Sequence, residues 1–441
     1  MSRLLSLLAP ACRASGGWAL LMITSDMTTH ESRANSTPSD ATPCVPAGGD
    51  VDGLIVFADD WGRHPSSPQH LIRRIREHLP VLWVNTIGTR SAGANQLTLF
   101  RGLEKLKSWA RGLRQVDRQM WVVDAPMLPS IGTASARFVS RLLVTQLVRF
   151  CLWKTEIRRP AVLTTVPHAS WLLGDVGQQA LVYYCTDDFS SWPSADQAAL
   201  AASEQELVKQ ADLVLAVSRQ LQSRHAAARR CEWFPHAVDF DHFASARTVT
   251  SAVEIQRLPG PRIGYFGLIY EKLDFGLLER IARSIPHGSL VMLGPRAWAP
   301  DEFFEIPNVT AVGAVPYESL PGWLAGLDVL LLPYHADDPM IRQSSPLKLR
   351  ECLATGKPTV CVDVPEARRY EPHVRVTSSQ DEFLQRVLES VSGPESPDVV
   401  AARQAAVEDE TWDLRATELL RLLQDTVRER SETRNRQRGV A

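Results

Sequence analysis

Short apolar runs bounded by turn residues recur along this chain, and they constrain its fold more than any other feature. In the first half of the chain these runs are rich in Val, Leu, Ile and Tyr and lack alternating polar residues. Such runs are typical of strands in a parallel sheet covered on both faces, since a sheet with one wet face shows alternation. The predicted strands are Leu54–Ala58, Val81–Asn85, Met120–Asp124, Ala161–Val166, Leu181–Thr186 and Leu213–Ser218.

Between these runs the apolar residues are spaced for helices. Segments His70–His78, Ala136–Ile157 and Asp196–Ala211 repeat apolar or small residues every three or four positions. Regular alternation of strand and helix is typical of an α/β, doubly wound domain.

The same alternation begins again in the second half of the chain. Two Rossmann-like doubly wound domains in tandem would face each other across a cleft, and such sheets bind ligands at the carboxyl ends of their strands. The later strands are predicted at Arg262–Gly267, Ser289–Gly294, Val309–Gly313, Val329–Tyr334 and Thr359–Asp363, and the helices at Phe275–Arg283, Leu320–Ala325, Leu347–Ala354 and Asp413–Thr426.

Composition along the chain predicts the domain boundaries. Residues 28–49 are rich in Ser, Thr and Pro, and residues 1–50 are expected to form a disordered leader, with a poor signal peptide at Leu4–Ile23 as the alternative. Residues 427–441 carry several arginines and are expected to form a disordered basic tail. The remaining boundaries are a first domain at 51–243, a linker at 244–260, a second domain at 261–410 and a closing helix at 411–426.

Composition and missing motifs exclude several classes of protein. Among 441 residues, 48 Lys and Arg oppose 50 Asp and Glu, so the net charge of −2 gives no general attraction to nucleic acid. Seven cysteines without a CxxC pair indicate reduced thiols, and no apolar run is long enough to span a bilayer. These features predict a cytoplasmic protein. GxGxxG, GxxxxGK[ST], GxSxG and HExxH are absent, and two Asp-x-Asp triplets lie where we expect no metal.

The most specific segment is SSPLKLRECLATGKPTV, residues 344–360. It places Lys348 and Glu351 three residues apart, on one side of a first helical turn. The free N–H groups of a helix N-terminus suit a diphosphate, Lys348 adds a cation, and Glu351 can accept hydrogen bonds from sugar hydroxyls. The same spacing equally suits a surface helix whose Lys and Glu pair with each other.

This segment resembles the donor-site helix of GT-B glycosyltransferases, particularly the retaining enzymes of glycosyltransferase family 4. The resemblance covers about Val51–Asp425 and rests on collinear order rather than on one motif. Two segments of the first domain, residues 61–71 and 182–193, are similar to the bacterial polysaccharide and cell-wall branch of this family. The matching segments are WGRHPSSPQHL (61–71), VYYCTDDFSSWP (182–193), WFPHAVDFDHF (233–243), PRIGYFGLIYEKLDFGLL (261–278), VMLGP (291–295), NVTAVGAVPYESLPGWLAGLDVLLLPY (308–334) and TWDLRATELLRLL (411–423).

The resemblance implies roles for residues of the donor domain. Glu351 would hold the ribose of a nucleotide sugar, and Gly267 would let the backbone approach the diphosphate. Lys272 would neutralise phosphate charge. Lys348 or Arg342 would supply positive charge that the loop around Lys272 otherwise lacks. Gly313 would line the base pocket, although a structural role as a turn residue fits it equally well.

One departure from the family concerns catalysis. The family pattern places two glutamates eight residues apart, and here the first position is Gln343. A glutamine still forms hydrogen bonds with a sugar hydroxyl but carries no charge, so an electrostatic role at this position is in doubt.

Candidate residues of the first domain follow predicted strand ends. His168 could contact the sugar or acceptor, and Asp187 or Asp188 could receive a proton from an acceptor hydroxyl. His64, in the first loop, is a further acceptor-side candidate. Capping, turn or core roles are the alternatives for all four residues.

Two basic segments, Arg101–Arg118 and Ala136–Arg159, combine apolar residues at helical spacing with arginines and a tryptophan. Each is predicted to be a basic amphipathic helix. Core packing with a solvated basic face explains them, and so does peripheral contact with an anionic membrane, on the inner face of the plasma membrane.

Together these features predict a glycosyltransferase of the hexosyltransferase type, acting in polysaccharide or glycolipid biosynthesis. It would move a sugar from a nucleotide-diphosphate sugar to a hydroxyl of a saccharide or lipid-linked saccharide, with retention, without a cofactor and without an obligatory metal. The alternatives are a sugar-nucleotide epimerase on the same fold and a catalytically silent GT-B scaffold.

Overall fold

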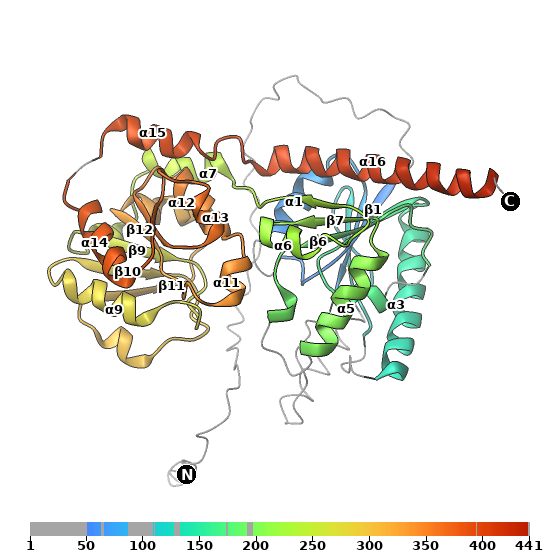
Figure 1. Cartoon of the computed structure of the whole chain (residues 1–441), viewed down its shortest axis with the longest axis horizontal. Coiled ribbons are helices and arrows are strands. Elements are labelled where there is room, and N and C mark those ends of the chain that lie inside the picture. The colour runs from blue at the N-terminus through green and yellow to red at the C-terminus, as the bar shows by residue number, and fades with distance from the viewer. Residues whose placement is uncertain are drawn as a thin grey trace, which may run out of the picture.

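A computed structural model gives the fold as two α/β domains joined side by side (Figure 1). It describes residues 51–62, 66–86, 109, 111–127, 133–172, 175–191, 197–393 and 395–439. The expected leader, residues 1–50, lies outside the described residues. No helix in the described part of the chain is long and apolar enough to cross a membrane.

The first domain is built on an eight-stranded sheet in the order β3-β4-β2-β1-β5-β6-β7-β8. Its neighbouring strands are parallel except for the pair β3 and β4, so the predicted parallel sheet is confirmed. The strands are β1 (Gly53–Ala58), β2 (Val81–Asn85), β3 (Arg114–Asp117), β4 (Met120–Asp124), β5 (Pro160–Thr164), β6 (Leu181–Cys185), β7 (Leu213–Ala216) and β8 (Cys231–Trp233).

Helices cover both faces of this sheet, which explains the lack of alternation in its strands. On one face, helix α1 (Ser67–Ile75) packs against the C-terminal helix α16 (Trp412–Gly439). The other face is covered by three helices in sequence order, α3 (Ala134–Lys154), α4 (Ala169–Leu172) and α5 (Gln197–Gln210) (Figure 1). The remaining elements are η1 (Phe189–Ser191) and α6 (Arg219–Arg224).

The helix expected over Arg101–Arg118 is wrong in its second half. Residues Arg114–Asp117 form strand β3, antiparallel to β4. Gln115 closes the tight turn between the two strands by donating to the carbonyls of Asp117 and Arg118. Charge also favours this edge strand, because Arg114 lies 3.6 Å from the buried carboxylate of Asp124. Residues 101–108 lie outside the described residues.

The second domain is built on a six-stranded parallel sheet in the order β11-β10-β9-β12-β13-β14. Its strands are β9 (Arg262–Phe266), β10 (Ser289–Leu293), β11 (Val309–Gly313), β12 (Val329–Leu332), β13 (Thr359–Val362) and β14 (Arg375–Thr377). Its helices are α9 (Phe275–Ser284), η3 (Asp301–Glu305), η4 (Tyr317–Ser319), α10 (Leu320–Ala325), α11 (Pro339–Gln343), α12 (Leu347–Ala354), α13 (Pro365–Arg368), α14 (Gln380–Ser390) and α15 (Pro397–Ala405).

The two hydrophobic cores divide between Ala237 and Val238, earlier than the boundary expected at residue 243. The expected linker, 244–260, is packed rather than extended. Its side chains Ala246 and Ile255 are buried in the second core, as is Phe243 just before it. The segment contains η2 (Ser245–Arg247) and α8 (Val253–Gln256) and follows α7 (Phe240–Ala244).

The chain returns to the first domain through α16 (Trp412–Gly439). Leu419, Leu422 and Leu423 of this helix are buried in the first core. The two segments in which the chain passes between the domains lie side by side. Val238 N donates to Glu410 O over 2.8 Å, and Val238 forms a β-bridge with Thr411.

The expected disordered tail is also wrong for residues 427–439, which continue α16 (Figure 1). Val427 is buried, Arg430 forms an ion pair with the buried Asp212, and Glu429 pairs with Arg230 over 3.2 Å. These contacts anchor the additional turns to the first domain.

Candidate functional site

Two glycines meet where the central strands of the second sheet end. Gly267 follows β9 with φ +125°, and Gly294 follows β10 with φ +143°, a region that side-chain-bearing residues rarely adopt. A Cβ placed on Gly294 would lie 1.9 Å from Gly267 O. Glycine is therefore required at both positions.

Lys348 of α12 crosses the backbone at Gly267. A Cβ on Gly267 would lie 1.7 Å from Lys348 Cε and 2.6 Å from its Nζ. Gly267 was expected to leave room for a diphosphate, and in the structure that room admits the Lys348 side chain. The two residues predicted to share a donor site are thus in direct contact.

Glu351 lies one turn further along α12. It was expected at an exposed helix start, but only 8% of the residue is exposed. Burial raises the pKa of Glu351, and the charge of Lys348 opposes this rise. No side chain caps α12 at Pro346, and in its first turn the N–H of Leu349 donates to Pro346 O over 3.1 Å. Gly267, Gly294, Lys348 and Glu351 are called the glycine cradle below.

A second cluster joins the two domains. Gln343 Nε2, at the end of α11, donates to Asp188 Oδ2 over 2.6 Å, and Arg224 Nη1 donates to Gln343 Oε1 over 3.2 Å. Arg224 also pairs with Asp188, and Ser218 Oγ donates to the Gln343 carbonyl over 2.6 Å. Asp188, Arg224 and Gln343 are called the cross-domain bridge below.

The hydrogen bonds of Asp188 hold it in the ionised form. Burial opposes ionisation, but hydrogen bonds from Ser191 and Ser190 and the charge of Arg224 outweigh it, so the pKa of Asp188 lies below its usual range. Asp188 is therefore a fixed anion of the bridge.

Asp187, its neighbour, differs in character. Burial, followed by the negative charge of Asp59, raises the pKa of Asp187 to about 7. The charge of Asp187 in turn adds to burial in raising the pKa of Tyr270, in the loop that follows Gly267. A carboxyl that titrates near neutrality and faces the second domain can accept or return a proton.

Comparisons with known proteins bear on the fold of the chain. No model of a known protein family matches the chain. Over 244 residues it is 24% identical to a Bacillus subtilis (strain 168) protein named "Putative teichuronic acid biosynthesis glycosyltransferase TuaH", a match that covers 51% of this chain and 59% of that relative. The match thus spans less than two thirds of the relative.

Solved structures match over most of the chain. Sucrose-phosphate synthase from Thermosynechococcus elongatus has a TM-score of 0.63 at 13% identity, over 85% of this chain and 98% of that one. HepE from Anabaena, in complex with UDP and glucose, has a TM-score of 0.56 at 14% identity, over 84% and 99%. An alpha,alpha-trehalose-phosphate synthase (UDP-forming) from Burkholderia vietnamiensis has a TM-score of 0.57 at 12% identity, over 85% and 99%. The chain has the GT-B fold.

Within this GT-B fold, three further residues were predicted to belong to the donor site. Lys272 Nζ is paired with Asp338 Oδ2 at 2.5 Å, an ion pair that the sequence did not suggest. Arg342 is exposed on α11, and Gly313 ends β11 with φ +83° and open space around it. The donor roles expected for these three residues stay predictions.

His168 is fully enclosed between β5 and α4. Neither of its ring nitrogens has a hydrogen-bond partner, and burial lowers its pKa to about 4, so the ring is neutral. It is 1% exposed, which places it beneath the surface of the first domain. His64, the other predicted histidine, lies outside the described residues.

Sequence reasoning missed Arg224 and Arg350. Arg224 lies on a short helix, and no local pattern distinguishes it from other surface arginines. Arg350 is fully buried in α12 and donates to Glu410 Oε2 over 2.6 Å and to Glu366 Oε1 over 3.2 Å. Through the hydrogen bond to Glu410, Arg350 connects α12, the helix of the glycine cradle, to the segment that leads into α16.

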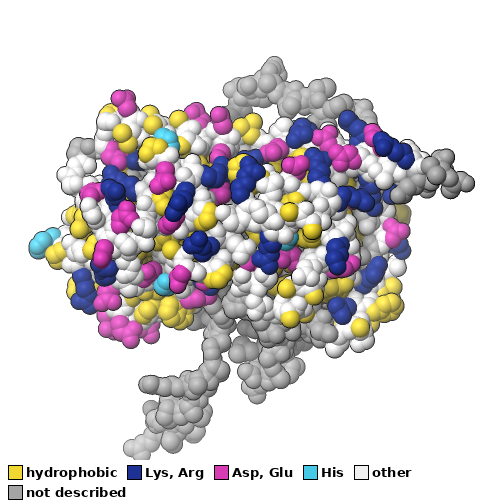
Figure 2. Space-filling model, in the orientation of Figure 1, with side chains coloured by type: hydrophobic (Ala, Val, Ile, Leu, Met, Phe, Trp, Pro, Cys, Tyr) yellow, Lys and Arg dark blue, Asp and Glu magenta, His cyan; other side chains and the backbone are white. Residues whose placement is uncertain are grey.

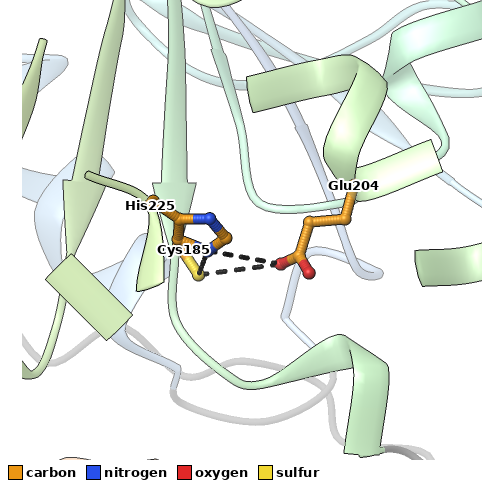
Figure 3. A group of neighbouring side chains, drawn as sticks. All are labelled: Cys185, Glu204 and His225. Carbon is orange, nitrogen blue, oxygen red and sulfur yellow. Dashed lines mark hydrogen bonds and ion pairs between the residues drawn. The ribbon is translucent and has the colours of Figure 1, made fainter. Parts of the chain in front are cut away.

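The first domain also contains a buried cluster of three side chains, Cys185, Glu204 and His225 (Figure 3). Cys185 Sγ lies 3.5 Å from His225 Nε2 and 3.9 Å from Glu204 Oε1, and the Tyr183 hydroxyl donates to that same oxygen over 2.7 Å. Burial raises the pKa values of Glu204 and the Cys185 thiol. We interpret the cluster as a hydrogen-bonded network that packs α5 and α6 against β6.

Proposed function

We propose that this protein is a glycosyltransferase that moves a sugar from a nucleotide-diphosphate sugar to a hydroxyl acceptor, with retention at the anomeric carbon. The observation that carries the proposal is the glycine cradle, which combines two close backbones, Lys348 and a buried carboxylate at the uncapped start of α12. Backbone N–H groups, a helix N-terminus and a cation are the groups that bind a diphosphate.

The first domain supplies what the acceptor side of this reaction needs. Asp187 is a half-buried carboxyl with a pKa of about 7 that faces the donor domain, so it suits the acceptor hydroxyl proton. The relative's name and the UDP in the HepE structure favour a uridine nucleotide sugar and a saccharide acceptor in cell-envelope polysaccharide synthesis. A positioned diphosphate leaving group would supply most of the catalysis.

Titration calorimetry against a panel of nucleoside diphosphates tests the donor site. Glu351→Gln keeps the size of a buried side chain and removes its charge, so the variant should bind the preferred nucleotide roughly tenfold to a hundredfold more weakly. The matched control is Glu318→Gln, an exposed glutamate of the same domain. Equal affinity of the Glu351→Gln variant and the parent protein, with both folded, would contradict the donor assignment.

We also propose that transfer needs no divalent metal. One carboxylate of each Asp-x-Asp triplet has another partner, because Asp52 accepts the backbone N–H groups of Arg158 and Arg159 and Asp239 lies 3.8 Å from Arg74. Nucleotide release in the presence of candidate acceptors should therefore be unchanged by excess EDTA. Loss of activity that Mn²⁺ restores would refute this part of the proposal.

A further inference from the structure

Helix α3 is apolar on both of its faces. Val144, Val148 and Leu152 are buried against the sheet. The face turned away from the sheet carries six further large apolar side chains, and Trp153 and Phe138 are 72% and 69% exposed. A helix on a protein surface normally turns charged residues outward, so a helix that is apolar all round has something to cover its outer face. The outer side chains are Phe138, Val139, Leu142, Leu143, Phe150 and Trp153.

These side chains lie in two groups along α3. In the first group, Phe138 and Leu142, like Val139 and Leu143, are four residues apart and therefore neighbours on the helix. In the second group, the rings of Phe150 and Trp153 lie 6.0 Å apart near the C-terminal end of the helix. Gln146, which is exposed, lies between the two groups, and together they extend over most of α3, a helix about 30 Å long. We call the two groups together the α3 face.

Basic residues border the α3 face. The helix carries Arg137, Arg141, Arg149 and Lys154 and no acidic residue, and Lys154 Nζ lies 5.9 Å from the ring centroids of both Phe150 and Trp153. Figure 2 shows yellow and dark-blue side chains side by side at the end of the molecule where Figure 1 places α3.

We propose that the α3 face docks on the surface of an anionic lipid bilayer, with the helix lying in the interfacial plane. Phe, Leu and Trp side chains among Arg and Lys are the composition that interfacial helices use. A second copy of the chain fits less well, because two α3 faces together would oppose eight basic side chains without an acidic one on either helix. The proposal is independent of the proposed donor site, which lies in the other domain.

Co-sedimentation of the full-length protein with vesicles tests the proposal. Vesicles of phosphatidylcholine mixed with phosphatidylglycerol should bind the protein, more weakly as salt rises, and vesicles of phosphatidylcholine alone should bind it far less. The variant Arg141→Gln/Lys154→Gln removes two exposed cations and should weaken binding to anionic vesicles roughly thirtyfold. Trp153→Ser should weaken it roughly tenfold.

Matched controls separate docking from general damage. Trp298→Ser changes an exposed tryptophan of the second domain, which is 48% exposed, and should leave vesicle binding unchanged. All variants should keep the parent's thermal unfolding and nucleotide affinity, because the altered side chains lie outside the core and the glycine cradle. Parent protein that stays in the supernatant with anionic vesicles at low salt overturns the proposal. Concentration-dependent dimers that Trp153→Ser abolishes would instead assign the α3 face to a second copy.

Discussion

At the scale of single residues, the cross-domain bridge explains how a glutamine serves at position 343. Its amide donates to Asp188 and its carbonyl oxygen accepts from Arg224, and a carboxylate could do only the second. The uncharged side chain therefore lets the two domains meet at a fixed anion. This gives Gln343 a positioning role beside any contact with a sugar.

Gln343→Glu should open the bridge at neutral pH. A second carboxylate would face Asp188, at a cost of about 2 kcal/mol to the closed contact. The new carboxyl would have a raised pKa, so the contact should be lost as pH rises through that pKa and regained at mildly acidic pH. Small-angle scattering should show a larger radius of gyration for the variant at neutral pH only.

The control for this prediction is Gln343→Ala, which removes both hydrogen bonds without adding a charge. Its effect on the radius of gyration should not depend on pH. A Gln343→Glu variant that matches either the parent or Gln343→Ala at every pH would show that the bridge does not discriminate charge.

At the scale of elements, α16 ties the end of the chain to the first domain. Arg430 and Arg229 both pair with Asp212, whose carboxylate also accepts the N–H of Leu181 at the start of β6. Since Asp212 is 8% exposed, removing these partners would leave a buried carboxylate without its ion pairs, which destabilises a fold.

Truncation after Thr426 should therefore destabilise the protein. It removes the buried Val427 and the cation of Arg430, and together these losses should lower the free energy of unfolding by about 3 kcal/mol. Arg430→Gln should lower it by about 1 kcal/mol, because Arg229 remains. The matched control is Arg428→Gln, an exposed arginine of the same helix, which should change it by less than about 0.5 kcal/mol. Urea unfolding measures the free energy of unfolding of all three variants. An unchanged urea midpoint for the truncated protein would show that residues after Thr426 do not stabilise the fold, as expected of a disordered tail.

At the scale of the whole molecule, several contacts in the described part of the chain join the two domains, and three of them differ in kind. The paired crossings at Val238 and Thr411 form the first, and the cross-domain bridge forms the second. At the third, the rings of Trp412 and His70 stack at 5.2 Å, and His70 lies 5.8 Å from Tyr317 of the second domain. The two domains are thus connected by the chain itself at one contact and by side-chain hydrogen bonds at another.

The sequence by itself determined the strands of both sheets other than the edge strands β3, β8 and β14, and about half of the helices that the structure describes. A continuous apolar run indicates a strand that is buried on both faces, and apolar residues at helical spacing indicate a helix with one buried face. Both patterns involve residues that are close in sequence, so they can be recognised without the tertiary structure. It also predicted that Gly267, Lys348 and Glu351 share a donor site, through resemblance to a family rather than through periodicity. Gly267 and Lys348 do lie in contact, and the donor role of the three residues stays a prediction.

Tertiary structure alone decided the features that join distant residues. Asp188 and Gln343 are separated by 155 positions, and Asp212 and Arg430 by 218, so no local pattern pairs them. Edge strand β3 depends on β4 and on Asp124, and the burial of Glu351 depends on what packs over α12. Local spacing states which side of an element is apolar, whereas ion pairs and cross-domain hydrogen bonds depend on which elements come to lie together.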